Sequence, residues 1–481
     1  MEAAFPSRGH VRWTALLVLV TLAFLRVAHI RLLWADEDYH LAAAVQILHG
    51  KLPYRDFWFD KPPLAALYYL LIGGHAGWPL RIVDALYILC ACWIIYRLGE
   101  KLWSPAEGWT AALLLAFFSA FYLPSAVIPF AADAIMLVPH LAAVYCASRG
   151  LAVWAGFWSG VALLANIKGL FVLAACAVWL AATDWLLLLL GFAFPTGAAL
   201  LWAALTAVWS GYLEQVWRWG VIYASQSPVR EPLKTGFVRT ADWLGFHAAL
   251  VAGSAYAIRN TPEKELLKLG SWLFLSFAAV CLGYRFAPHY YLQMLPVLVL
   301  LGARGGVRLW QQHRRITIAL AAVLLGVPLA RFGPRYALLA YDLVEHRRPH
   351  WSDVVMDLDS QDVAHRIHFL SPAGDTLFVW GYRPNIYVYT RLSSDGPFWD
   401  SQPLTGVPAD RHLSASGAIY KGPAAANRLE LARSHPTFLV DGLSLMNPKL
   451  QPSVYPELRP WLAHYRLVDR TKLSLIYERI D

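Results

Sequence analysis

Residues 34–64 read WADEDYHLAAAVQILHGKLPYRDFWFDKPPL and directly follow the first apolar segment of the chain. They hold five carboxylates and three Lys or Arg side chains; Asp36, Glu37 and Asp38 open the stretch, and Lys61 precedes Pro62 and Pro63 near its end. Charges at the end of an apolar segment are typical of a solvated loop. They also suit chemistry on a charged substrate at a lipid boundary, so both interpretations stay open at this point.

Two segments in this region are apolar but too short to cross a bilayer, which takes ~20 helical residues. Residues 40–48 predict a helix with one apolar face, and we expect it to lie on a membrane surface. Residues 64–74 predict a second short segment that tucks into the membrane interface.

The composition is that of a polytopic membrane protein. Of the 481 residues, 58% are hydrophobic and only 15% are charged, which excludes an ordinary soluble globular domain. The 22 Trp and 23 Tyr residues are typical of membrane interfaces. Much of the net charge of +9 lies in short loops, where it sets orientation and contacts anionic headgroups, so we expect no nucleic-acid partner. The five cysteines lie in apolar segments and predict buried thiols rather than disulfides.

Apolar runs predict about eleven transmembrane helices, with the N-terminus in the cytoplasm and the C-terminus on the periplasmic side of a cell (inner) membrane. Several groups of Lys and Arg residues fall on the cytoplasmic side of this arrangement and support it, whereas the 31–63 and 211–240 segments place further Lys and Arg on the opposite side. The cytoplasmic groups are Arg97 with Lys101, Arg149, Arg259 with Lys264 and Lys268, and those from Arg304 to Arg315. The predicted spans are 13–30, 79–98, 106–123, 133–148, 152–167, 169–183, 185–210, 241–258, 270–284, 289–304 and 315–331.

The composition changes near residue 335 and predicts two domains. Residues 1–334 form the transmembrane domain, with a first periplasmic loop at 31–78 and a long loop at 211–240. The aromatic first half of the long loop fits a lid over a membrane-embedded site and an interfacial anchor helix equally well. Residues 335–481 predict a soluble, periplasmic α/β domain, because strand-like and helical runs alternate there. The strand-like runs are 376–380, 386–390, 437–440 and 473–478, and the helical runs are 353–369, 424–434 and 456–464.

The first loop carries its charged and turn-forming residues in an order that resembles a known enzyme superfamily. Together they resemble the polyprenyl-phosphate-dependent C-type (GT-C) membrane glycosyltransferases, which include the bacterial protein O-mannosyltransferases and the lipid A aminoarabinose transferases. Residues 160–169 (GVALLANIKG) and 289–296 (HYYLQMLP) add to the similarity. The matching residues of the loop are Asp36, Glu37, Tyr39, Gly50, Pro53, Tyr54, Asp56, Lys61 and Pro62.

The resemblance implies an inverting glycosyltransferase that moves a hexosyl or pentosyl group from undecaprenyl phosphate to an acceptor hydroxyl at the periplasmic face. Attack by a hydroxyl needs a base, and Asp36 matches the family's catalytic aspartate. Glu37 points to another helix face and is expected to orient a partner or hold the loop. Asp38 is the alternative base, because three acids are adjacent here. The acceptor hydroxyl belongs to a protein, a lipid or a glycan.

A lipid phosphate leaves more easily when cations meet its growing negative charge. Lys61 matches the family's lysine before proline and is the first candidate for this role. Arg285 and Lys168 are further candidates, with contact to membrane headgroups as the alternative. The residues expected to bind the lipid phosphate or the donor are Lys61, Arg285, Lys168, His289, Tyr290 and Tyr54.

Two further acids complete the candidates. Asp133 begins an apolar segment, where an acid favours a helix N-terminus, and Asp56 lies in a turn; each is either structural or on the acceptor side. No cofactor is required by these residues. A divalent cation (Mg²⁺, Mn²⁺ or Ca²⁺) stays an open alternative, because Asp36 and Asp133 would supply suitable oxygen ligands if they converged.

Two other classes of protein handle the same lipid-linked sugars. A transporter or flippase should carry ionisable groups or interrupted helices at mid-span and two related halves, whereas the charges here gather at one membrane face. An O-antigen polymerase or ligase would place its key residues in large loops between later spans, and the 211–240 loop keeps this alternative open.

Overall fold

The computed structural model describes residues 8–123, 129–226, 231–259, 261–349, 351, 354–370 and 375–481. The chain forms two compact units, each made of three segments. Unit 1 comprises Met1–Ile30, Arg81–Ala198 and Ser227–Arg348, and unit 2 comprises Arg31–Leu80, Ala199–Gln226 and Pro349–Asp481. The predicted domain boundary at residue 335 stays a prediction.

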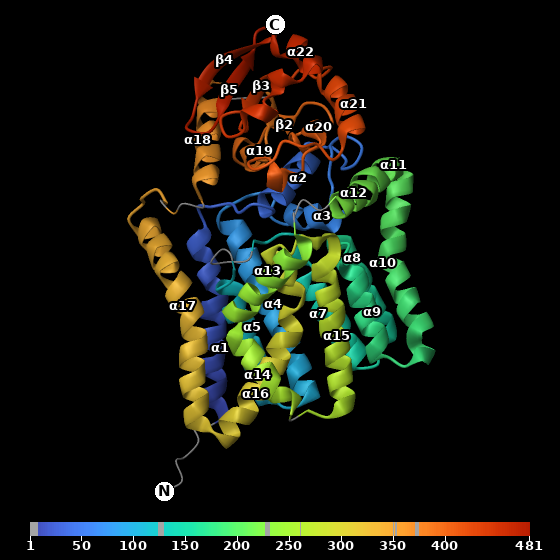
Figure 1. The fold of residues 1–481 in the computed structure, drawn as a ribbon, viewed down its shortest axis with the longest axis vertical. Coiled ribbons are helices and arrows are strands. Elements are labelled where there is room, and N and C mark those ends of the chain that lie inside the picture. Colours follow the sequence, from blue (N-terminus) through green and yellow to red (C-terminus); the bar gives the residue numbers. More distant parts are fainter. Residues whose placement is uncertain are drawn as a thin grey trace. The chain divides into compact units, whose positions relative to one another are not determined.

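Unit 1 is a bundle of helices that run side by side (Figure 1). Helix α16 packs against α5, α14 and α17, while α7, α8 and α9 pack against one another and α15 packs against α9. The helices are α1 (Arg8–Phe24), α4 (Trp78–Leu102), α5 (Pro105–Ala120), α6 (Ala132–Ile135), α7 (Leu137–Ser148), α8 (Ala152–Ala165), α9 (Gly169–Trp179), α10 (Trp185–Leu205), α13 (Pro232–Phe246), α14 (Ala248–Ile258), α15 (Glu263–Cys281), α16 (Leu295–Gln312) and α17 (Arg314–Val344).

Each predicted span is mainly helical, and the spans 133–148 and 241–258 each include parts of two helices. Within the described residues, five helical segments are long and apolar enough to cross a membrane. The helical membrane class is therefore confirmed, and the count of eleven spans stays a prediction because the helices in the other six predicted spans are shorter or less apolar. The five segments are Arg12–His29, Trp78–Leu102, Ala182–Leu205, Glu263–Tyr284 and Arg314–Val344.

Two buried ion pairs fix neighbouring helices of the bundle. Arg26, in the short 3-10 helix η1 (Leu25–His29), contacts the carboxylate of Asp84 in α4, and both side chains are almost fully buried. Arg304 of α16 donates to Glu107 of α5 at 2.8 Å. A charge in an apolar interior is tolerated when it is paired. These pairs therefore favour one arrangement of helices over its alternatives.

Glycines allow α14 and α16 to approach closely. A Cβ atom added at Gly305 of α16 would overlap the backbone carbonyl of Gly253 in α14, and one added at Gly253 would lie 2.7 Å from the carbonyl oxygen of Gly302. Small residues at a helix crossing permit such backbone contact in membrane proteins. Their presence explains why these two helices form the most intimate contact in the bundle.

Unit 2 contains a five-stranded mixed sheet with the strand order β2-β1-β3-β5-β4. Strand β1 pairs in parallel with β2 and β3, whereas β5 pairs antiparallel with β3 and β4. Figure 1 shows α18 and α21 flanking the sheet in this view. The strands are β1 (Thr376–Trp380), β2 (Ser393–Ser394), β3 (Phe438–Asp441), β4 (Tyr465–Arg470) and β5 (Leu475–Arg479).

The helical elements of unit 2 come from all three of its segments. The helices are α2 (Glu37–Leu48), α3 (Leu64–Leu70), α11 (Trp209–Tyr212), the π-helical turn η3 (Leu213–Arg218), α12 (Trp219–Ser225), α18 (Val355–Leu370), α19 (Asn385–Thr390), α20 (Gln402–Thr405), α21 (Lys421–Leu431) and α22 (Arg459–Leu462).

The core of unit 2 joins segments that lie far apart in the sequence. Trp58 of the first loop and Trp219 of α12 belong to the same buried cluster as Phe378 and Trp380 of strand β1. The Trp399 indole N–H also donates to the Trp58 carbonyl at 2.7 Å. Burial of aromatic side chains stabilises such a core strongly. The first loop is thus an integral part of the unit that holds the sheet.

Two sequence-based expectations are corrected here, and the structure of the 211–240 segment is given beside them. The 40–48 helix exists within α2, but its residues from Glu37 to Gln46 are buried by α3, α19 and β2, so it does not lie on a membrane surface. The predicted strand at 386–390 is helix α19, since burial on all sides and Pro384 at its start override the β propensity of these residues. The 211–240 segment is helical in its described part; residues 227–230 lie outside the described residues.

Candidate active site

Helix α2 begins with a turn in which Asp36 has an unusual backbone conformation. Asp36 is the N-cap residue, with φ 75° and ψ −41°. Residues other than glycine occupy this region only when their surroundings enforce it. The side chain is partly exposed, and within the part of the chain that the structure describes no hydrogen bond or ion pair engages its carboxylate. An unpartnered carboxylate of this kind can accept a proton from a substrate hydroxyl.

The two acids that follow Asp36 are buried and engaged. The Oε1 atom of Glu37 accepts a hydrogen bond from the backbone N–H of Trp34 at 2.7 Å, which closes the turn. The Oδ1 atom of Asp38 accepts one from the backbone N–H of Tyr39 at 2.8 Å. Burial, together with the nearby charge of Asp36, raises the pKa of Asp38 well above its usual value. A carboxyl group that retains its proton is a poor base, so Asp36 is the best candidate of the three.

Lys61 lies on the same loop and is held from two sides. Its Nζ atom is 3.2 Å from Oδ1 of Asp60, and its backbone carbonyl accepts a hydrogen bond from the Tyr54 hydroxyl at 2.7 Å. Oδ2 of Asp60 accepts hydrogen bonds from the Trp219 indole at 3.2 Å and the Gln402 amide at 3.4 Å. The Lys61 side chain remains 36% exposed. The ammonium group is therefore both positioned and accessible to an anion such as a phosphate.

Aromatic rings hold the beginning of α2. The ring of Tyr39 stacks on Phe59 and on Tyr382, with centroid separations of 5.5 Å and 5.4 Å. The Nδ1 atom of His40 contacts the backbone carbonyl oxygen of Asp36. Sequence patterns did not indicate a role for His40 or Tyr382, because a histidine or tyrosine among aromatic residues resembles ordinary core. The signal for both is structural, namely their contact with the turn that carries the candidate base.

Asp400 is a second acid that sequence patterns did not indicate. It is 1% exposed, and its Oδ1 accepts a hydrogen bond from the Gln402 backbone N–H at 2.7 Å. Its Oδ2 has no hydrogen-bond partner among the described residues. Burial raises the pKa of Asp400 to about 7; the charge of Asp60 raises it as well, whereas Lys61 lowers it. Only the fold brings this acid within electrostatic reach of the Lys61 loop.

Asp56 is engaged in its own turn. Its carboxylate forms an ion pair with Arg55 at 2.8 Å and accepts a hydrogen bond from the Leu52 backbone N–H at 2.8 Å. The bond from Arg55 lowers the pKa of Asp56. These contacts give Asp56 a clear part in shaping the loop between α2 and Lys61.

Several of the other predicted residues gather around Asp133 in unit 1. The Nζ atom of Lys168 lies 3.1 Å from Oδ1 of Asp133 and 3.3 Å from the ring centroid of Tyr290. The Asn166 amide donates to the same Oδ1 at 3.1 Å, and His289 Nε2 is 3.8 Å from Oδ2. Asp133 and Lys168 are 8% and 6% exposed. The sequence motif at 160–169 thus contributes a cation that a carboxylate and an aromatic face hold in place.

Arg285 is also buried in unit 1. It is 5% exposed, and its backbone carbonyl accepts a hydrogen bond from Arg239 at 2.6 Å. Its predicted part in donor binding stays a prediction.

The side chains that the structure places near Asp133 include the Lys168 ammonium. Among the described residues, no group of three or more His, Cys, Asp and Glu side chains is arranged to hold one. The Lys168 ammonium lies where a cation would contact Oδ1 of Asp133. Asp36 and Asp133 belong to different compact units. The divalent cation of the sequence-based alternative therefore stays untested.

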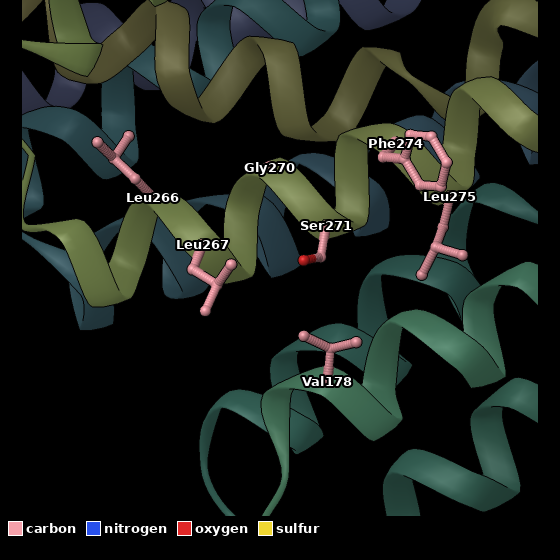
Figure 2. Close-up of a pocket in the computed structure, with 7 residues that line it drawn as sticks. All are labelled: Val178, Leu266, Leu267, Gly270, Ser271, Phe274 and Leu275. Atoms are coloured by element: carbon pink, nitrogen blue, oxygen red, sulfur yellow. The ribbon is translucent and has the colours of Figure 1, made fainter.

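An apolar groove of about 500 Å³ lies between α9 and α15. Figure 2 shows Val178 of α9 facing Leu267, Ser271 and Leu275 of α15. Ser271 is the one polar side chain among the seven residues that line the groove. Such a lining suits a hydrocarbon chain and contains no charged group, so the groove is distinct from the candidate active site.

The sequence matches no protein-family model and no characterised protein at a significant level. Solved structures, in contrast, resemble the chain over its whole length. ArnT from Cupriavidus metallidurans bound to undecaprenyl phosphate is 16% identical, with a TM-score of 0.61 and coverage of 99% of both chains. The apo state of the same protein has a TM-score of 0.58 at 16% identity and covers 98% of both.

The archaeal oligosaccharyltransferase AglB from Archaeoglobus fulgidus, in complex with an inhibitory peptide and a dolichol-phosphate, is more distant. It is 13% identical, with a TM-score of 0.49, and the match covers 94% of this chain and 72% of that one. The similarity to ArnT includes both the helical bundle and the C-terminal sheet, because it spans nearly the entire chain. The protein therefore has the fold of the C-type (GT-C) polyprenyl-phosphate glycosyltransferases, as its first-loop motif predicted.

Proposed function

We propose that this protein is an inverting membrane glycosyltransferase that moves a sugar from a polyprenyl phosphate to an acceptor hydroxyl at the periplasmic face. The observation that carries the proposal is the unpartnered carboxylate of Asp36, held on a strained turn in the first loop, which also carries the accessible Lys61. Its support is the shared fold with ArnT, a protein that was crystallised with undecaprenyl phosphate. The donor is accordingly a sugar on undecaprenyl phosphate or a similar lipid.

Asp36 acts as the general base in this proposal. Its carboxylate takes the proton from the acceptor hydroxyl while the hydroxyl oxygen attacks the anomeric carbon. A new carbon–oxygen bond forms on one face of the sugar, and the bond to the phosphate oxygen breaks on the other. The configuration at the anomeric carbon is therefore inverted, and the polyprenyl phosphate leaves as the dianion that it can form without protonation.

Lys61 meets the negative charge of the lipid phosphate. It is accessible, and its ion pair with Asp60 fixes the direction of its ammonium group. A fixed cation of this kind favours departure of the phosphate, because it stabilises charge that grows in the transition state. We assign donor-phosphate binding to Lys61. Lys168, which Asp133 and the face of Tyr290 hold within unit 1, stays a separate candidate from the sequence motif.

The proposal is tested by transfer of radiolabel from undecaprenyl-phosphate sugars to endogenous acceptors in membranes that contain the wild type or Asp36→Asn. We expect transfer by the wild type and a loss of about 10³-fold in the variant, in the range for removal of a general base. The matched control is Asp469→Asn, since Asp469 pairs with Arg366 on the surface of unit 2. Equal transfer by the wild type and Asp36→Asn would reject Asp36 as the base.

A wild type that transfers no sugar from a broad panel of donors would reject the glycosyltransferase proposal as a whole. The same membranes then serve for a flipping assay with fluorescent lipid-linked sugars. Flipping without transfer would identify the transporter class instead.

A further inference from the structure

The strained turn at Asp36 needs something to hold it. A side chain other than glycine at φ 75° relaxes to a negative φ unless neighbouring contacts prevent this. Such a relaxation would rotate the Cα–Cβ bond and move the carboxylate. The position of the candidate base therefore depends on the groups that fix the backbone of residue 36.

His40 contacts this backbone directly. One turn along α2, its Nδ1 atom meets the carbonyl oxygen of Asp36. The imidazole is 1% exposed and cannot turn freely, because it stacks on Tyr69 at an interplanar angle of 24° and meets Phe59 edge-on at 90°. Tyr39 closes a third side at 89°. The aromatic cage thus holds the ring in the orientation that places Nδ1 at the carbonyl.

The contact also defines which tautomer is present. A carbonyl oxygen only accepts hydrogen bonds, so Nδ1 carries the proton. Burial lowers the pKa of His40 to about 4; the bond to the Asp36 carbonyl opposes this, and the charge of Lys61 adds to it. The ring is therefore neutral near pH 7. Its Nε2 atom carries a lone pair and has no hydrogen-bond partner in the described part of the chain.

We propose that His40 is a positioning residue for Asp36: its Nδ1–H, donated to the Asp36 carbonyl, holds the turn in the conformation that places the carboxylate for proton abstraction. This inference rests on the proposed function of Asp36 as the base. His40 acts through the backbone and touches no reacting atom. Glu37 supports the same turn from its other side through the Trp34 N–H.

The test uses two substitutions of His40 that distinguish the role of Nδ1 from that of Nε2. In His40→Asn the amide N–H₂ lies near the position of Nδ1 and can still donate to the Asp36 carbonyl. In His40→Gln the amide reaches toward the position of Nε2, and the local donor is lost. His49→Gln is the matched control, because His49 is an exposed histidine at the end of the same helix that contacts the Arg391 carbonyl instead.

Transfer kinetics of the full-length protein with an undecaprenyl-phosphate sugar give the readout. We expect His40→Gln to lower kcat by roughly 10²-fold, the order of loss caused by a misplaced catalytic group, with KM for the donor nearly unchanged. We expect His40→Asn and His49→Gln to stay within about threefold of the wild type. A merely structural role would lower the amount of folded protein and would not separate Asn from Gln.

A double variant shows whether the effect passes through Asp36. In the Asp36→Asn background, His40→Gln should cause no further loss of the residual rate, because residues that act as a unit are non-additive. Equal losses in His40→Asn and His40→Gln, or a full additional loss in the double variant, would overturn the positioning role. Activity of the wild type and inactivity of Asp36→Asn verify the base independently, so normal activity of His40→Gln would reject the role of His40 alone. An inactive wild type would reject both inferences.

Discussion

Asp36 and Asp133 carry a similar signal in the sequence, and the structure gives them opposite surroundings. Each is an acid at the beginning of a helix. Asp36 in unit 2 is partly exposed and unpartnered within the described residues. Asp133 in unit 1 is 8% exposed, and Lys168, Asn166 and His289 surround its two oxygens. The partners that the fold supplies, rather than the position on a helix, distinguish a carboxylate that can react from one that anchors a cation.

Asp400 adds a third case to this comparison. It is 1% exposed, against 8% for Asp133, and within the described residues it accepts a single hydrogen bond, to one of its two oxygens. Without a cation in direct contact, burial favours the neutral acid, and the pKa of Asp400 rises to about 7. The three acids therefore differ in their surroundings. Asp36 is an unpartnered carboxylate, Asp133 pairs with a cation, and Asp400 is a buried acid with a raised pKa.

The largest expected effect is on the rate of sugar transfer, when Asp36 is replaced. Asp36→Asn should lower the transfer rate by about 10³-fold, or about 4 kcal/mol in activation free energy. It should leave the thermal stability of the purified protein within about 0.5 kcal/mol, because no contact of the carboxylate is lost. Transfer rates and melting temperatures of the same preparations check both statements. A large loss of stability would show that Asp36 is structural, like Asp133.

The second prediction concerns the pH dependence of stability, through Asp400. Its pKa rises from 3.8 to about 7 on folding, so the folded state binds this proton more tightly than the unfolded state. The resulting stabilisation is complete below pH 4, is lost as the pH rises to 7 and is absent above it. A shift of about three pKa units corresponds to about 4 kcal/mol at most. Asp400→Asn remains neutral, so its stability relative to the wild type should rise between pH 4 and pH 7.

Melting temperatures of both proteins between pH 4.5 and pH 8 measure this difference. Burial also lowers the pKa values of His40 and His412 to about 4. These two histidines produce the opposite slope, because stability increases as the pH rises through their unfolded pKa. They are present in both proteins and cancel in the comparison. Parallel pH profiles for the two proteins would show that Asp400 is ionised in the folded state.

Much of the fold follows from local patterns in the sequence, and the exceptions have physical causes. Apolar runs predicted the helices, and the β-branched and aromatic run at Thr376–Trp380 predicted β1 correctly. The similar run at Asn385–Thr390 forms α19, because five of the six residues between Pro384 and the left-handed Arg391 are buried, and the helix packs against α2 and α18. Burial determined the secondary structure of this segment, and a local sequence pattern does not indicate burial.

The candidate site is likewise only partly predictable from the sequence. Asp36 and Lys61 belong to a motif that lies within one loop, so the sequence could indicate them. Asp400 acquires its environment from residues 340 positions away, and His40 gains its role from a backbone conformation that no composition reveals. The ion pair between Asp133 and Lys168 joins two separate helices, so it is found only once the folded structure is known. Contacts of this kind follow from the tertiary structure alone.

The third prediction sharpens the role of Asp133 as an anchor. Asp133→Asn leaves the buried Lys168 ammonium without its carboxylate, which should cost about 3 kcal/mol in the free energy of unfolding, as is typical when one partner of a buried pair is removed. Thermal unfolding in detergent micelles measures the loss. A change of less than about 0.5 kcal/mol would show that the cation is held without the Asp133 carboxylate, with the ring of Tyr290 among its remaining contacts.

The smallest effect is expected when both members of this pair are replaced. Asp133→Asn combined with Lys168→Met removes the two buried charges together and keeps a long apolar side chain against Tyr290. Because replacing a complete buried pair is often close to neutral, its stability should return to within about 1 kcal/mol of the wild type. If Lys168 binds the donor phosphate, as the sequence motif predicts, the double variant should fold normally and still show a raised KM for the polyprenyl-phosphate sugar. Restored stability together with a normal KM would make the pair purely structural.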